Sequence, residues 1–113
     1  MLKTDLEIKN RLKKFTKRTT YALAELLILK TLTKAPAHGY KINLNLKRDI
    51  GFYFGPSTIY PILTSLLNEG YILREEKTSH RRQIIEYRIT YRGKAFLKQC
   101  QLKHSMLIRF LQD

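Results

Sequence analysis

The side chains of this sequence that could carry binding chemistry are mostly cations. The 113 residues include 22 Lys and Arg against 9 Asp and Glu, which gives a formal net charge of +13. The segment Lys77-Thr78-Ser79-His80-Arg81-Arg82 is polar and basic and contains no acid. Such a chain is suited to a polyanionic partner, and both nucleic acid and an anionic membrane surface qualify.

The residue spacings that support catalysis do not occur. The sequence lacks a nucleophile spaced with its base, paired carboxylates, a phosphate-cradling glycine loop and a metal-ligand cluster. We therefore expect no enzyme activity, no catalytic residues, no cofactor and no metal.

The single cysteine, Cys100, leaves several interpretations open. It rules out an internal disulfide framework. Cys100 and His104 stand four residues apart on an expected helix, so they could share a metal only if a dimer-related pair completed the site. Cys100 could also cross-link two subunits across a two-fold axis, or it could be a small buried hydrophobe.

The elements that position these groups begin with a basic amphipathic helix between residues 2 and 15. Lys17 and Arg18 prolong its charge. Thr19 or Thr20 is then expected to cap the next helix.

Three more helices are expected between residues 21 and 69. Residues 21–33 are apolar on nearly every side, so they predict a central core helix. A shorter, more basic helix starts near residue 40 and ends at Gly51. A third runs from about residue 57 to 69, with Gly70 as its C-terminal cap.

Residues 71–73 and 85–89 predict a pair of strands. Ile85, Tyr87 and Ile89 alternate with charged residues, which is the period of a half-buried strand. The basic segment of residues 77–82 lies between the two strands, so it forms the tip of a hairpin. Thr90 then caps a last helix over residues 91–111.

The order of three helices followed by a basic hairpin predicts a winged helix-turn-helix. The fold class is therefore mainly α with a small β-hairpin (α+β), extended by a helix at each end. We divide the chain into a basic N-terminal helix (1–18), a winged-helix DNA-binding domain (19–90) and a C-terminal dimerisation helix (91–113).

The third helix is the candidate for reading DNA. A helix that enters the major groove, about 12 Å wide, needs a narrow polar face without acids. The candidates are Ser57, Thr58, Tyr60, Pro61 and Thr64. Strong bidentate base readers are missing there, so readout falls to Thr and Tyr or to DNA shape. Ser57 could instead be a plain N-cap, and Tyr60 could pack beneath the helix.

Phosphate contacts are expected from residues around this helix. They are Lys17 and Arg18 before the core helix, and Lys77, His80, Arg81 and Arg82 of the hairpin. The hairpin tip could also be only a solvated loop.

Four segments resemble the PadR family of transcriptional regulators. They are Ala24-Glu25-Leu26-Leu27-Ile28-Leu29, Ala37-His38-Gly39-Tyr40-Lys41-Ile42, Gly55-Pro56-Ser57-Thr58-Ile59-Tyr60-Pro61-Ile62-Leu63 and Glu69-Gly70-Tyr71-Ile72. The resemblance extends from about Tyr21 to Leu97, and its most specific parts are the His-Gly-Tyr step and the Ser-Thr-Ile-Tyr-Pro start of the third helix.

The resemblance implies a homodimeric winged-helix repressor whose C-terminal helix builds the dimer interface. The short tail is similar to that of the small family members. His38, Tyr40 and Lys41 then open the second helix on the DNA side. His38 could cap that helix, touch a phosphate or be a turn histidine bonded to backbone. A small-molecule effector is compatible with the resemblance, but the sequence does not identify one.

We expect the two terminal helices to pair two chains. The interface candidates are Leu2, Leu6, Leu12 and Phe15 in the first helix and Phe96, Cys100, Leu107 and Leu111 in the last. Pairing would set the two third helices about 34 Å apart, one turn of DNA, so the operator should be an inverted repeat of duplex DNA.

Two other functions fit the same charge. One is RNA binding, or non-specific architectural binding of nucleic acid. The other treats residues 2–15 as a membrane-surface helix. No stretch approaches the roughly 18 apolar residues of a membrane span, and no secretory signal is evident, so we expect a cytoplasmic protein.

Overall fold

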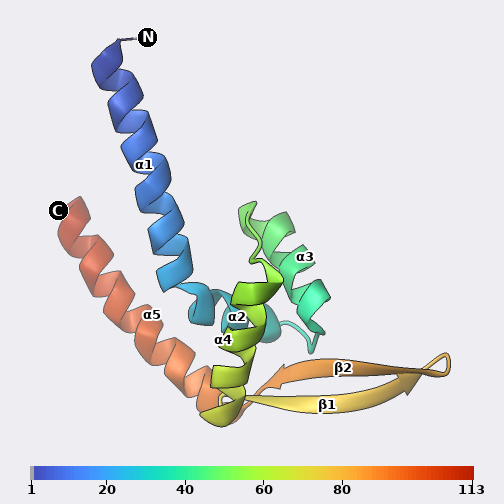
Figure 1. Cartoon of the computed structure of the whole chain (residues 1–113). Helices are drawn as coiled ribbons and strands as arrows, with labels where there is room; N and C mark the ends of the chain where they lie inside the picture. The colour runs from blue at the N-terminus through green and yellow to red at the C-terminus, as the bar shows by residue number, and fades with distance from the viewer. Residues whose placement is uncertain (1) are drawn as a thin grey trace.

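The computed structural model describes residues 2–113 as a mostly helical fold with one two-stranded antiparallel sheet (Figure 1). The elements are α1 (Lys3–Ala22), α2 (Ala24–Leu32), α3 (Gly39–Ile50), α4 (Pro56–Asn68), β1 (Ile72–Ser79), β2 (Arg82–Ile89) and α5 (Tyr91–Gln112). The predicted fold class, mainly α with a small β-hairpin, is confirmed.

Helix α2 is the centre of the core. Ile28 and Leu29 are fully buried, and α2 contacts α1, α3, α4, α5 and β2. The other fully buried large side chains come from the elements around it: Ile42, Phe54, Ile59, Leu63, Leu66 and Ile72. The prediction of a central core helix is confirmed, because a helix that is apolar all round must be covered all round.

Helix α1 is longer than the sequence predicted. Thr19 and Thr20 cap nothing: their hydroxyls donate to the carbonyl oxygens of Phe15 and Thr16, four residues back, at 2.9 Å each. The predicted helix start at these threonines was therefore wrong, and the break comes at Leu23. The division between residues 18 and 19 lies inside α1. No residue of α1 is buried, and the helix projects from the body of the molecule (Figure 1).

Helix α3 begins and ends as expected. The His38 side chain caps its start, and Gly51, with a φ of +70°, ends it in the left-handed region. Just before α3, Ala37 forms a bridge with Tyr87 of β2, with N···O distances of 3.1 and 2.8 Å. This bridge ties the start of α3 to the hairpin.

Helix α4 starts one residue earlier than predicted. Gly55 is the N-cap and Pro56 occupies the first turn, so Ser57 lies inside the helix and the N-cap interpretation of Ser57 was wrong. Pro61 stands inside the helix and removes one backbone donor. The helix ends as predicted: Gly70 has a φ of +76°, and the Tyr71 N–H bonds the Leu66 carbonyl at 2.9 Å.

The hairpin is longer and its turn tighter than the sequence indicated. The strands pair from Ile72 with Ile89 to Ser79 with Arg82, and only His80 and Arg81 form the turn. Most of the expected loop at residues 77–82 is therefore strand, because paired backbone extends beyond the buried part of a hairpin. Tyr87 and Ile89 join the core.

Helix α5 leaves the core after its first turns. Thr90 caps it as predicted, accepting a hydrogen bond from the Gly93 N–H at 3.0 Å. Leu97 is buried, and residues 101–113 are all exposed. None of the helices in the described part of the chain is long and apolar enough to cross a membrane.

Candidate nucleic-acid interface

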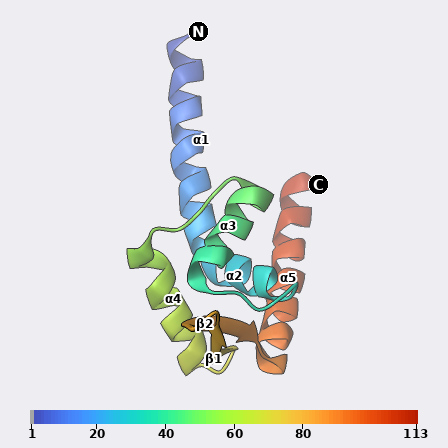
Figure 2. The ribbon, with the colours of Figure 1, turned by 90° about the vertical axis from the view of Figure 1, so that its right-hand side faces the viewer.

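The start of α3, the first half of α4 and strand β2 meet at one crevice. Its volume is about 260 Å³, and it is lined by His38, Gly39, Tyr40, Tyr60, Gln83, Ile85 and Tyr87. Figure 2 shows α3, α4 and the hairpin on the same side of the molecule. Burial raises the pKa of the Tyr87 phenol, so this group stays neutral at the base of the crevice.

His38 holds the N-terminus of α3. Its Nδ1 accepts a hydrogen bond from the Lys41 N–H at 3.0 Å, so the capping role is confirmed. Because Nδ1 accepts, the ring proton lies on Nε2, which is available to donate to a phosphate oxygen. Tyr40 stacks on the His38 ring, with centroids 6.2 Å apart, and is 67% exposed.

Tyr60 leans from α4 across to the start of α3. Its side chain is 49% exposed, so it does not pack away beneath the helix. A Cβ atom at Gly39 would lie 3.1 Å from the Tyr60 hydroxyl oxygen. The absence of a side chain at Gly39 therefore permits this position of the Tyr60 ring.

The outer face of α4 is polar, and no residue of α4 is charged. Ser57, Pro61 and Thr64 are exposed, and Thr58 is partly exposed. The Thr64 hydroxyl donates to the Tyr60 carbonyl at 3.0 Å, so its oxygen is left to accept a further hydrogen bond. Ser57, Pro61 and Thr64 thus share one accessible face, and Thr58 and Tyr60 lie at its two edges.

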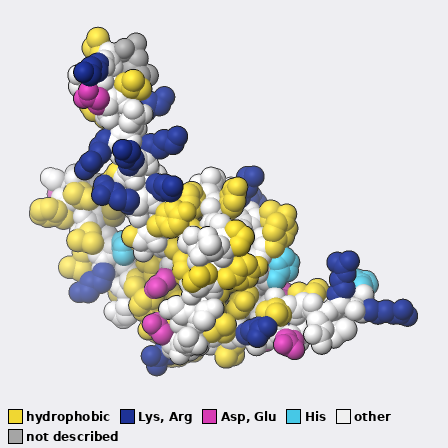
Figure 3. Space-filling model, in the orientation of Figure 1, with side chains coloured by type: hydrophobic (Ala, Val, Ile, Leu, Met, Phe, Trp, Pro, Cys, Tyr) yellow, Lys and Arg dark blue, Asp and Glu magenta, His cyan; other side chains and the backbone are white. Residues whose placement is uncertain are grey.

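The tip of the hairpin carries two exposed arginines and an exposed histidine. We call the hairpin of β1 and β2 the wing. His80, Arg81 and Arg82 are exposed at its far end, where Figure 3 shows Lys, Arg and His side chains together. Lys77 differs, because its Nζ lies 2.8 Å from a carboxylate oxygen of Glu86. Its charge is locally compensated, so the tip depends mainly on the other three residues.

Lys17 and Arg18 point in different directions from α1. Lys17 lines a groove with Phe52, on the side of α1 that faces the loop between α3 and α4. Arg18 lies over the Phe15 ring at 5.9 Å and lines a different groove. The structure therefore does not bring these two neighbours to one site.

Sequence reasoning missed the loop that leads into α4. Tyr53 is 58% exposed, and the Lys47 Nζ lies 5.6 Å from the centre of its ring. Both line a pocket of about 290 Å³ that also includes Tyr40 and Pro56. The aromatic run Phe52-Tyr53-Phe54, in a segment between two helices, was the signal available in the sequence.

The same loop is held by Asn43 of α3. The Asn43 side chain donates to the Phe54 carbonyl at 2.8 Å and accepts from the Phe54 N–H at 2.9 Å. These two bonds fix the backbone immediately before the N-cap of α4. Asn43 thus positions the helix that carries the candidate reading face.

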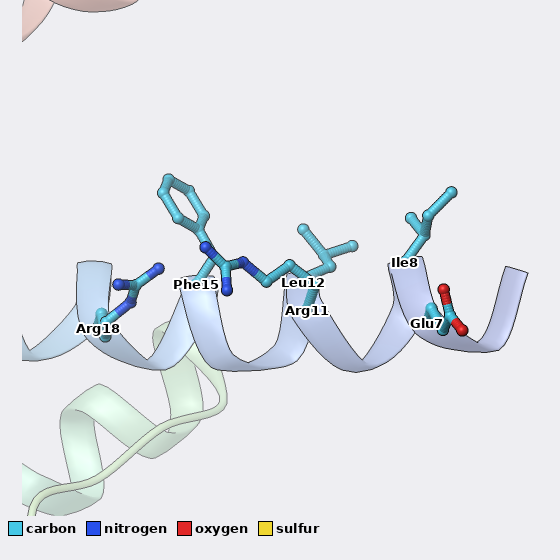
Figure 4. A pocket seen from close by; sticks show the side chains of 6 residues that line it. All are labelled: Glu7, Ile8, Arg11, Leu12, Phe15 and Arg18. Carbon is cyan, nitrogen blue, oxygen red and sulfur yellow. The ribbon is translucent and has the colours of Figure 1, made fainter. Parts of the chain in front are cut away.

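The predicted interface residues of α1 do not share one face. At about 100° per residue, Leu12 and Phe15 lie on one side with Ile8, whereas Leu6 lies about 120° from Leu12. Figure 4 shows Ile8, Leu12 and Phe15 pointing the same way from α1. These three side chains are 56–61% exposed and line an open groove of about 640 Å³. Leu2 lies before the helix begins and is 74% exposed.

The candidates on α5 also separate into two groups. Phe96 stacks on Tyr71 of the same chain, with centroids 4.6 Å apart. Leu107 and Leu111 are 62% and 76% exposed, beyond the body of the molecule. Part of the predicted interface set on α5 is thus used within the subunit.

Cys100 and His104 lie one turn apart on α5. His104 Nδ1 lies 3.0 Å from the Cys100 carbonyl oxygen, so the ring bonds its own helix. Over residues 2–113, no three His, Cys, Asp or Glu side chains gather as metal ligands do. Burial, and then the Glu25 carboxylate, raise the pKa of the Cys100 thiol, which lowers its thiolate fraction.

Comparisons with known proteins point to one family. Residues 28–99 match the model of the "Transcriptional regulator PadR-like family". None of the curated proteins matches the sequence.

Solved structures resemble most of the chain. A PadR family transcriptional regulator from Eggerthella lenta is 21% identical, with a TM-score of 0.81 over 94% of this chain and 93% of that one. A PadR-like regulator from Bacillus cereus is 21% identical, with a TM-score of 0.75 over 84% and 93%. PadR of Bacillus subtilis, solved in complex with operator DNA, is 28% identical, with a TM-score of 0.63 over 70% of this chain and 46% of PadR.

Proposed function

The chain belongs to the PadR-like family of transcriptional regulators, with a winged-helix fold, and from this premise we propose that it acts as a homodimeric repressor. Each subunit would place α4 in a major groove of an inverted-repeat operator. Because its proposed partner is chromosomal DNA, we expect the protein to act in the compartment that holds the chromosome, which we take to be the cytoplasm. The role requires binding alone, so we assign it no catalytic residue, cofactor or metal.

One observation carries the proposal. The uncharged polar face of α4, the His38-capped start of α3 and the cationic tip of the wing lie on one side of the molecule. A duplex presents base edges in its groove and phosphates on both rims, so a reading helix flanked by donors on either side matches it. PadR of Bacillus subtilis, which is similar to this chain, was solved in complex with operator DNA, and this supports DNA binding as the function.

We assign the residues to two roles. Thr58, Tyr60 and Thr64 read the groove, and Ser57 and Pro61 accompany them at the start of α4. His38, Tyr40, Lys41 and the wing tip hold phosphates. Because α4 offers no Arg, Asn or Gln at its start, we expect part of the specificity to come from DNA shape.

The experiment is selection from a labelled pool of genomic fragments by the purified protein at near-physiological salt. Excess non-specific DNA and a matched RNA serve as competitors. We expect a few fragments that share an inverted repeat. Uniform recovery would mean an architectural protein, and loss of all DNA binding to the RNA would mean an RNA-binding one.

The selected operator then separates the two roles. The double variant R81A/R82A should weaken binding to all DNA sequences alike, and it should make the affinity less dependent on salt concentration. Thr58→Ala or Thr64→Ala should instead change the ranking of operator variants. If the threonine changes lower affinity equally for every variant, α4 does not read bases.

A further inference from the structure

The cations of this protein are not concentrated on its reading helix. Helix α4 has no charged residue, and several cations of the winged helix have carboxylate partners. Lys77 pairs with Glu86, Arg88 with Glu75 at 3.0 Å, and both Arg48 and Lys34 with Asp49 at 2.9 and 3.5 Å. Much of the charge that could hold a duplex must therefore lie elsewhere.

Helix α1 carries a large share of that charge. Its 20 residues hold seven Lys and Arg and two acids, Asp5 and Glu7. Among the described residues, no ion pair involves a cation of α1. The helix keeps its charge although it projects from the body and none of its residues is buried (Figure 3).

Three lysines follow one face of α1. Lys9, Lys13 and Lys17 are spaced by four residues, about 6 Å along a helix, and all three are exposed. With Thr16 and Thr20 they line a groove of about 630 Å³ whose other wall includes Phe52. We call Lys9, Lys13 and Lys17 the lysine face. Its centre lies about 130° around α1 from the groove that Ile8 and Phe15 line, and Leu12 borders both grooves.

The lysine face continues into the candidate DNA interface. Tyr21, at the end of α1, packs edge-on against Phe52 and Phe54, with ring centroids 5.8 and 5.6 Å apart. The next residues along this loop, Tyr53 and Pro56, line the pocket that reaches Tyr40 at the start of α3. One surface therefore runs from α1 across the loop to the helix that reads the groove.

We propose that the lysine face is a second phosphate-binding surface, which holds the duplex beyond the contacts of α4 and the wing. This inference rests on the proposed function, because it needs duplex DNA at α4. Lysines supply point charges on flexible stems, so they can follow a phosphate backbone without reading sequence. The two sides of α1 then have different partners: the apolar side takes a second subunit and the lysine side takes DNA.

The test compares two triple variants of equal charge. K9Q/K13Q/K17Q removes the lysine face, and K94Q/K98Q/K103Q removes three exposed lysines of α5 as the control. Glutamine is a good helix former and none of these side chains is buried, so both variants should fold. Circular dichroism and sedimentation check folding and subunit mass. The probe is a labelled mixed-sequence duplex of about 40 base pairs, titrated from about 50 to 200 mM salt.

We expect the lysine-face triple to reduce the slope of log affinity against log salt. If two of its three lysines touch phosphates in each subunit of a dimer, the slope should fall by about 3 to 4. The α5 triple should change it by less than about 1. On the selected operator, hydroxyl-radical protection should shorten in the lysine-face variant and keep its full length in the control.

Three results would overturn the inference. An unchanged slope in K9Q/K13Q/K17Q removes α1 from the DNA contact, and an equal fall in both triples assigns the effect to net charge alone. Loss of binding to anionic lipid vesicles with an unchanged DNA slope would make the lysine face a membrane surface. The proposed function itself fails separately, if the unmodified protein prefers structured RNA to the duplex.

Discussion

Two residues at the wing tip occupy backbone conformations that most side chains avoid. His80 and Arg81 have φ values of +50° and +65°, as both central residues of a tight two-residue hairpin turn require. Asn-Gly is the pair that fits such a turn with least strain. We infer that His80 and Arg81 are there for their side chains, at the end of the wing that faces DNA.

This strain predicts opposite changes in stability and binding. H80N/R81G should raise the free energy of unfolding by about 1 to 2 kcal/mol, because it relieves two left-handed residues. It should also weaken DNA binding, because it removes two side chains that we propose to face phosphates. Thermal unfolding and titration with a labelled duplex measure the two effects.

Arg82→Ala is the control for the wing turn. Arg82 lies in β2 and has no such strain, so its loss should weaken binding without raising stability. If H80N/R81G binds DNA as well as the unmodified protein, the tip makes no contact and the turn is only structural.

At the scale of elements, the junction between α3 and α4 depends on Asn43. Asn43→Ala should lower the free energy of unfolding by about 2 to 3 kcal/mol, because it leaves the half-buried N–H and C=O of Phe54 without partners. Among molecules that stay folded, operator affinity should fall more than affinity for non-specific DNA. Chemical denaturation and competition binding report the two effects.

Two variants on the same helix test the specificity of this effect. Asn45→Ala, two residues along α3, should be nearly neutral. Asn43→Asp keeps the acceptor for the Phe54 N–H but places a carboxylate against the Phe54 carbonyl. If the bond that Asn43 accepts is the stronger of the two, the stability of Asn43→Asp should lie between those of the unmodified protein and Asn43→Ala. Equal effects at positions 43 and 45 would show that the clamp does not orient α4.

The start of α5 is packed through Gly93 against Tyr71, just before β1, and against Ile89 of β2. A Cβ at this position would lie 2.1 Å from the Tyr71 carbonyl oxygen and 2.9 Å from Ile89 Cγ1. Gly93→Ala should therefore cost at least about 1 to 3 kcal/mol of stability, since backbone must move to admit the methyl group. Gly55→Ala, where nothing lies within 4 Å, is the matched control. Equal melting temperatures for the two variants would contradict this packing.

At the scale of the whole molecule, the two projecting helices determine the shape. The chain extends 58 × 30 × 21 Å, and the apolar side chains beyond the body lie on α1 and α5. Exposed apolar residues clustered in this way are typical of a surface that binds a partner. We expect a second copy of the chain to cover them.

The dimer prediction is tested on α1 itself. L12Q/F15Q should shift the sedimentation mass from dimer to monomer, because burial of each such side chain contributes about 1.5 to 3 kcal/mol and each occurs twice in a symmetric pair. Leu6→Gln changes an exposed leucine on a different side of α1, so it should leave the mass unchanged. A monomer for the unmodified protein would remove the homodimer from the proposed function.

Local signals in the sequence were sufficient for the element order and the fold class. The apolar period of α2, the glycines at 51 and 70 and the cap at Thr90 each act within one or two turns of chain, so they could be predicted correctly. The helix start at Thr19 or Thr20 and the cap at Ser57 were wrong for the opposite reason. Threonine and serine are also compatible with a helix interior, and packing further along the chain decides which role they take.

By itself the sequence determined what kind of protein this is: a basic winged helix whose motifs resemble those of one regulator family. Only the tertiary structure decided which residues share a surface. It paired Lys77 with Glu86, joined Asn43 to Phe54 and stacked Phe96 on Tyr71. The physical reason is that helix and strand propensities act between neighbours in the chain, whereas a shared surface depends on rotation about each helix axis and on contacts between distant segments.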